Sequence, residues 1–152
     1  VAAWTILDVD GLTNDSQPAG IGVICSWNLV DTEEHFGYTS AGYSLVSTSY
    51  TVQGTQVEDW AITPQITIEA GAKLFYKAWA TDADFPDGYI LKLAPNGGNT
   101  TADFTVTLST YDEATTNPAL IRQVDLPPDR RWARAPLATP WRRRRGRPCG
   151  RP

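Results

Sequence analysis

Three aspartates combine a residue type and a setting that suit a calcium site. Asp8 and Asp10 stand two positions apart just before Gly11, and Asp59 opens a second apolar segment. Residues two apart in an extended strand share a face, and a turn at Gly11 would add backbone carbonyl groups. Ca²⁺ takes about six to eight oxygen ligands, several of them carboxylates. Asp8, Asp10 and Asp59 are therefore candidate metal ligands; the alternative is that Asp8 and Asp10 cap a turn and Asp59 begins a strand.

Aromatic residues near predicted loops are candidates for ligand binding. Five of them lie in or beside loops: Trp27, Tyr38, Tyr43, Tyr50 and Tyr111. Sugars stack their apolar faces on such rings, although each single ring can equally belong to the core. We predict Trp27, Tyr38 and Tyr111 as ligand-binding residues.

The sequence offers little for catalysis. His35 is the only histidine, and no Gly-x-Ser-x-Gly segment is present for a Ser-His-Asp hydrolase. Two carboxylates could form a glycosidase pair, but nothing selects a pair among so many acids. We predict a non-catalytic protein and assign no catalytic residue. The alternative is a glycan-active hydrolase or lyase of β-sandwich fold, and a third interpretation is a structural spacer between domains.

The charge of the chain is divided between two segments. Residues 1–126 carry 4 basic and 16 acidic side chains, a net charge of −12; residues 127–152 carry 9 Arg and 1 Asp, a net charge of +8. An acidic domain with few lysines binds nucleic acid poorly, because phosphate contacts supply most of that affinity. It suits an extracellular domain or one that gathers cations at its carboxylates.

Alternating side chains predict the elements that position these residues. The clearest strands are residues 73–81 and 89–93, joined by a turn rich in Asp, Pro and Gly. Further strands are predicted near residues 4–8, 21–27, 42–47, 104–109 and 119–126, with a loop at 31–38, another at 110–118 and a tight turn at 95–99. Short strands without long helices predict an all-β fold, a jelly-roll-type antiparallel β-sandwich.

The cysteines and the hydropathy of the chain limit which disulfides and membrane-spanning segments are possible. A disulfide between Cys25 and Cys149 is possible, but a buried thiol at Cys25 is the favoured interpretation. No apolar run reaches the roughly 18 residues that span a bilayer. No signal peptide or initiator Met is present, so we interpret the chain as a mature or excised fragment, which leaves secretion open.

Two segments resemble the cleaved-adhesin, or choice-of-anchor J, family. The segment Trp4-Thr5-Ile6-Leu7-Asp8-Val9-Asp10-Gly11 resembles the family's Trp-Thr-x-x-Asp-x-Asp-Gly start. Asp59-Trp60-Ala61-Ile62-Thr63-Pro64-Gln65-Ile66 resembles its central motif, which ends in Thr-Pro-x-Ile/Leu. A Leu-x-Phe-x-Ala-x-Ala type of strand at residues 74–80 and an Asp-Phe step at 103–104 follow in the family's order. The similarity spans roughly residues 4–126.

This resemblance implies a function as well as a fold. Family members occur in surface and secreted proteins of Bacteroidetes-type bacteria, including the adhesin regions of gingipains. They imply a jelly-roll sandwich that holds structural Ca²⁺ and serves as an extracellular adhesion module for a glycan or surface protein. Such a module usually lies beside other domains of the same polypeptide.

The chain departs from the family pattern after Leu126. The family continues into a Val-x-Ile-Ala-Phe-Arg type of strand, whereas here Pro127 and an Arg-rich, Pro-rich segment follow. We therefore predict a domain at residues 1–126 that lacks its closing strands and exposes an unpaired edge. Residues 127–152 are predicted to be disordered or non-native, as from a shifted reading frame or truncation; a nucleic-acid-binding or membrane-binding tail and a flexible charged extension are the alternatives.

Overall fold

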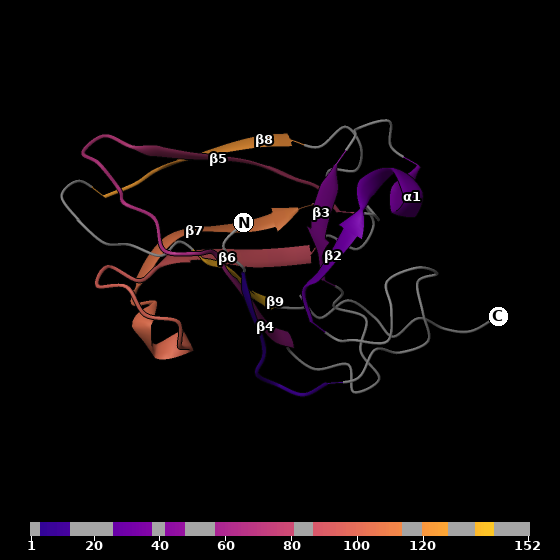
Figure 1. The fold of residues 1–152 in the computed structure, drawn as a ribbon, viewed down its shortest axis with the longest axis horizontal. Helices are drawn as coiled ribbons and strands as arrows, with labels where there is room; N and C mark the ends of the chain where they lie inside the picture. Colours follow the sequence, from indigo (N-terminus) through magenta and orange to yellow (C-terminus); the bar gives the residue numbers. More distant parts are fainter. Residues whose placement is uncertain are drawn as a thin grey trace.

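Strands make up most of the computed structural model, which describes residues 4–12, 26–37, 42–47, 57–80, 87–113, 120–127 and 136–141 (Figure 1). The strands are β1 (Thr5–Asp8), β2 (Asn28–Asp31), β3 (Tyr43–Val46), β4 (Val57–Ile62), β5 (Lys73–Ala78), β6 (Asp87–Leu93), β7 (Val106–Glu113), β8 (Leu120–Asp125) and β9 (Pro136–Trp141). The helices are α1 (Thr32–Phe36) and the 3-10 helix η1 (Thr101–Asp103).

These strands form three antiparallel sheets. The largest has the order β1-β4-β9-β6-β7, and two smaller sheets pair β2 with β3 and β5 with β8. Figure 1 shows β5 and β8 as a separate layer that runs along β6 and β7. The predicted all-β antiparallel sandwich is therefore confirmed.

Two clusters of buried side chains lie on opposite faces of the large sheet. On one face, Trp60 and Ile62 of β4 pack with Ala94 and Phe104, and Leu7 of β1 adds to them. On the other face, Leu93 of β6 packs with two residues that flank the β5–β8 layer, Ile68 and Leu126. β4 is buried along almost its whole length, although it contains the two acidic residues Glu58 and Asp59.

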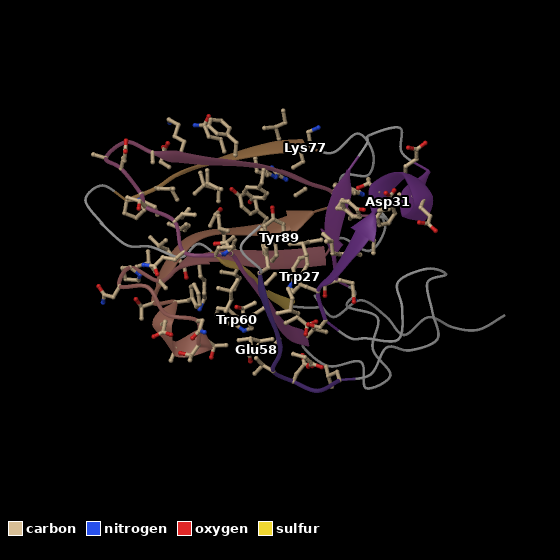
Figure 2. All side chains as sticks on the ribbon, in the orientation of Figure 1. Trp27, Asp31, Glu58, Trp60, Lys77 and Tyr89 are labelled. Atoms are coloured by element: carbon tan, nitrogen blue, oxygen red, sulfur yellow. The ribbon has the colours of Figure 1, made fainter. Side chains whose placement is uncertain are left out.

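The β5–β8 layer follows the period of two that the sequence predicts. Exposed and half-buried residues alternate along β5, and β8 pairs with it without a register shift. Its inner side chains reach β6: the hydroxyls of Tyr76 and Tyr89 lie 3.0 Å apart. Figure 2 shows Tyr89 among the side chains between the two layers.

Three local predictions need correction. Residues 31–38 were expected to form a loop, but Asp31 ends β2 and caps α1 by accepting hydrogen bonds from the amides of Glu33 and Glu34. The predicted strand at 21–27 does not include Ser26 and Trp27; its other residues lie outside the described part. β7 continues through Tyr111, beyond the strand end predicted at residue 109, because β6 supplies paired backbone as far as Glu113.

Among the described residues, no helix is long and apolar enough to span a membrane.

A strand also lies beyond the predicted domain boundary at residue 126. β9 pairs with β4 on one side and with β6 on the other, so the described sheet has no gap there. Pro136–Trp141 therefore form a strand that the sequence did not predict, and β4 and β6 do not expose an unpaired edge at these positions. Whether residues 127–152 are native sequence stays a prediction, as does the boundary itself.

Proline explains why this strand is hard to predict. Pro136 and Pro140 have no N–H group to donate, so a sequence that contains both argues against a central strand. In the structure, β9 pairs with β6 only through Leu137 and Ala138, which lie between the two prolines.

Candidate functional site

The register of β1 and β4 brings the three predicted aspartates together. Asp8 lies directly opposite Asp59 in the antiparallel pair, so their side chains share a face. Asp10 follows two residues after Asp8, and one carboxylate oxygen of each aspartate lies within 4.8 Å of the others. Of the sequence-predicted sites, this cluster is the one that the fold assembles completely.

The turn after β1 orients two of the carboxylates. The amide of Gly11 donates to Asp8 Oδ1 at 2.7 Å, and the amide of Leu12 donates to Asp10 Oδ1 at 2.9 Å. Gly11 has a φ of 61°, a left-handed conformation that glycine adopts without strain. Asp10 Oδ2 also accepts the amide hydrogen of Glu58, which fixes the turn against β4. The turn-capping alternative is thus correct for Asp8 and Asp10, and it coexists with the cluster.

Asp59 differs from the other two because it is fully buried. Its exposed fraction is 0%, whereas Asp10 is half-buried and Asp8 is exposed. Burial raises the pKa of Asp59 from 3.8 to about 7, and the negative charges of Asp10 and then Asp8 add to the rise. Hydrogen bonds from serine hydroxyls oppose this shift in pKa, including one from Ser47 Oγ to Asp59 Oδ2 at 3.3 Å.

Trp27 lies against the same strand. Its indole Nε1 donates to the backbone oxygen of Asp59 at 3.3 Å, and its side chain is half-buried. This contact holds the segment before β2 against β4. The sequence predicts Trp27 as a ligand-binding residue but does not predict its contact with Asp59 or that of Ser47, because both residues are far from Asp59 in the sequence.

The donor set suits a hard divalent cation. All three side chains are carboxylates, and the cluster contains no nitrogen or sulfur ligand of the kind that Zn²⁺ prefers. Three carboxylates in close contact repel one another, and a divalent cation would remove most of that repulsion. Each carboxylate oxygen has two lone pairs, so an oxygen that accepts a backbone amide hydrogen can still bind a cation. The residues therefore fit Ca²⁺.

Tyr111, a second predicted ligand-binding residue, is half-buried in a cluster of rings. It lies opposite Tyr89 across β6 and β7, with ring centroids 5.2 Å apart, and Tyr76 stands 6.5 Å away. The guanidinium of Arg122 lies 4.9 Å from the centroid of Tyr111. The cluster bridges the two layers at this point, and a role for Tyr111 in ligand binding stays a prediction.

The other residues that the sequence singles out lie in different environments. Tyr38, Cys25 and Cys149 lie outside the described residues, so the structure does not place them. Trp60 is buried in the core. Tyr43 is the most exposed of the large hydrophobic and aromatic residues described, at 72%, although the sequence analysis did not select it.

Comparison with known proteins identifies solved structures that resemble the fold of this chain. No protein-family description and no curated relative matches the chain. A cleaved adhesin domain of Lys-gingipain from Porphyromonas gingivalis superposes with a TM-score of 0.62 at 23% identity, covering 91% of this chain and 83% of that domain. A second cleaved adhesin domain of Lys-gingipain gives a TM-score of 0.60 at 17% identity, covering 91% of this chain and 87% of the other. The chain therefore has the fold of the cleaved adhesin domains, the family that its sequence resembles.

Proposed function

We propose that this chain is an extracellular adhesion module that Ca²⁺ stabilises and that binds a glycan or a surface protein. One observation carries the metal part of this proposal, namely the three carboxylates that meet at the β1–β4 pair with Asp59 fully buried. The adhesion part rests on the likeness to two adhesin domains, which are proteins of the same fold. We assign it no catalytic role.

A bound cation would act on stability through the cluster. Asp8 and Asp10 belong to the turn after β1, and Asp59 belongs to β4. A cation held by all three would link the edge strand to a central strand of the large sheet. Because the unfolded chain does not hold these carboxylates together, the cation would bind the folded state and raise its stability.

A thermal melt of the full chain tests the metal. We expect the melting temperature to be several degrees higher with Ca²⁺ than with EGTA, since ligand at about 100 times its dissociation constant adds about 2.7 kcal/mol. Asp59→Ala should abolish this shift. Glu69→Gln, which removes an exposed acid outside the cluster, should retain it.

Two results would contradict the metal site. Identical melts of the wild-type chain in Ca²⁺ and EGTA would remove the cation from the proposal. A full Ca²⁺ shift in Asp59→Ala would show that the ion binds elsewhere in the chain.

Binding of labelled protein to a glycan array and to immobilised surface proteins tests adhesion. We expect specific binding that Asp59→Ala weakens indirectly, because the loss of the cation loosens the β1–β4 pair. Uniform absence of binding by a chain that retains its Ca²⁺ shift would favour a structural spacer. This readout is separate from the metal test, so each part of the proposal can fail alone.

A further inference from the structure

The outer face of the β5–β8 sheet carries exposed apolar side chains. We define the β5–β8 face as the outward residues Lys73, Phe75, Lys77, Ile121, Gln123 and Asp125. Phe75 is 60% exposed and Ile121 is 70% exposed. Phe75 lies opposite Gln123 and Ile121 opposite Lys77, so the two apolar side chains are diagonal neighbours. Large exposed apolar residues that are neighbours mark interaction surfaces more often than scattered ones do.

The same face is basic within an acidic domain. Lys73 and Lys77 are two of the four basic residues in positions 1–126. Lys73 Nζ lies 2.5 Å from Asp125 Oδ1, while Lys77 is exposed beside Ile121 and has no ion-pair partner among the described residues. Figure 2 shows Lys77 on the outer side of the layer. The β5–β8 face therefore has a net charge of +1.

A second face has the complementary character. We define the β2–β3 face as the outward residues Leu29, Asp31, Tyr43 and Leu45 together with Glu33 and Glu34 of α1, which directly follows β2. Leu29 is 67% exposed and Tyr43 is 72% exposed, and the register of β2 and β3 places both on one face. Glu33 and Glu34 are also exposed. With the half-buried Asp31, whose carboxylate caps α1, the two glutamates give this end of the β2–β3 sheet three carboxylates and a net charge of −3.

We propose that the β5–β8 face of one copy of this chain binds the β2–β3 face of a second copy. Each face is a two-stranded sheet with exposed apolar side chains beside charges, and the charges of the two faces have opposite sign. Pairing of the β5–β8 face with itself would bring together two surfaces that each have a net charge of +1. Pairing of the β2–β3 face with itself would place carboxylates against carboxylates, and both arrangements cost binding energy. The contact is therefore between two different surfaces, a heterologous contact.

Chemistry favours a second copy over an unrelated apolar partner. The chain itself provides the acidic surface that the β5–β8 face requires, at the same concentration as that face. Phe75, Ile121, Leu29 and Tyr43 are all exposed, so the described part of the chain leaves both pairs of side chains uncovered. Apolar contact would supply the attraction, and the opposite charges would set the orientation.

Complementation between two variants tests the proposal. One variant carries Phe75→Thr and Ile121→Thr, which disables the β5–β8 face; the other carries Leu29→Thr and Tyr43→Thr, which disables the β2–β3 face. Thr suits exposed strand positions, so both variants should keep the wild-type circular dichroism and melting temperature. Sedimentation velocity of the full chain, at concentrations rising to about 1 mM, measures association.

We expect the wild-type chain to associate and each variant alone to stay monomeric, or to associate at least about tenfold more weakly. An equimolar mixture of the variants should form a 1:1 complex, because each contributes the face that the other has lost. A wild-type chain that stays monomeric at every concentration would overturn the proposal. So would variants that associate as the wild type does, or a mixture that fails to form the complex when the wild type associates.

Charge reversal provides an independent check on the pairing of faces. Lys77→Glu and Glu34→Lys should each weaken association, since each places like charges across the contact. A mixture in which Lys77→Glu meets Glu34→Lys restores one attractive pair and should associate more strongly than either variant alone. Equal association of the mixture and the single variants would assign the contact to other residues.

Discussion

Two carboxylates opposite each other across paired strands destabilise a sheet unless something neutralises them. Asp8 and Asp59 have this arrangement, and Asp59 is also fully buried. Hydrogen bonds from serine hydroxyls reduce the energetic cost of ionised Asp59. Its raised pKa indicates that burial and the negative charges of Asp10 and Asp8 have the larger effect. A protein can hold such a residue as a neutral acid or as a ligand of a cation, and pH distinguishes the two states.

Replacement of Asp59 by Asn in the absence of metal should show the cost directly. The pKa of Asp59 is about 7 in the folded state and near 3.8 when unfolded, so its contribution to stability is fully present below about pH 4. That contribution is lost as the pH rises through about 7. In EGTA, Asp59→Asn should therefore melt at a higher temperature than the wild type near pH 8, and the difference should shrink as the pH falls towards 5.

The size of this effect has an upper bound. Each pH unit between the two pKa values changes the free energy of unfolding by at most about 1.4 kcal/mol. Chemical unfolding at several pH values measures it, and Glu69→Gln, an exposed acid, provides the control. Parallel curves of wild type and Asp59→Asn would show that Asp59 is not strained by burial. With Ca²⁺ at pH 8 the order should reverse, because the neutral amide oxygen binds the cation more weakly than the carboxylate does.

Packing between the strands holds the aspartate cluster in place. β6 is central to the large sheet, and its residue Leu93 is 1% exposed, in contact with residues that flank the β5–β8 layer. β8, in contrast, has an outward residue, Ile121, that is 70% exposed. Leu93 and Ile121 have side chains of the same size. A comparison of their truncations therefore separates the effect of burial on stability from the effect of side-chain volume.

Truncation of these two residues should have very different effects. Leu93→Ala should reduce the free energy of unfolding by about 2–5 kcal/mol, because it removes buried apolar surface and leaves a cavity between the layers. Ile121→Ala should change it by about 0.5 kcal/mol or less. Urea unfolding of both variants measures this difference. Similar losses would show that the layers do not pack as the structure has them.

At the level of the whole molecule, closure of the large sheet depends on β9, which lies in a C-terminal segment whose composition differs from that of residues 1–126. β9 joins β4 to β6, and without it these two central strands would each present unpaired backbone groups. β9 is also the connection between the β1–β4 side, which carries the aspartates, and the β6–β7 side, which carries the aromatic cluster.

A chain that stops at Pro127 should therefore be less stable and more prone to aggregate than the full chain. We expect a lower melting temperature and loss of solubility as the exposed edges pair between molecules. A matched variant that ends at Trp141 retains β9 and should behave as the full chain does. Equal melting of all three chains would show that β9 contributes nothing to closure and would support the sequence-based boundary at residue 126.

The sequence determined the parts of this protein that depend on neighbouring residues. Alternation along β5 and β8 and the turn at Gly11 follow from side chains close together in the chain, and these features could be predicted. The aspartate cluster was also predicted, because Asp8 and Asp10 are neighbours and the family resemblance supplied Asp59. Prediction failed at β9 and at the end of β7, where pairing with a distant strand overrides weak local preference.

Tertiary structure alone decided what each predicted residue contacts. Only the register of β1 against β4 sets Asp59 opposite Asp8, and only the packing of the layers buries Asp59 enough to shift its pKa. The same packing places Trp27 against β4, half-buries Tyr111 and leaves Tyr43 exposed. The physical reason is that burial and electrostatic repulsion depend on distances between segments far apart in the sequence, which local side-chain patterns do not determine.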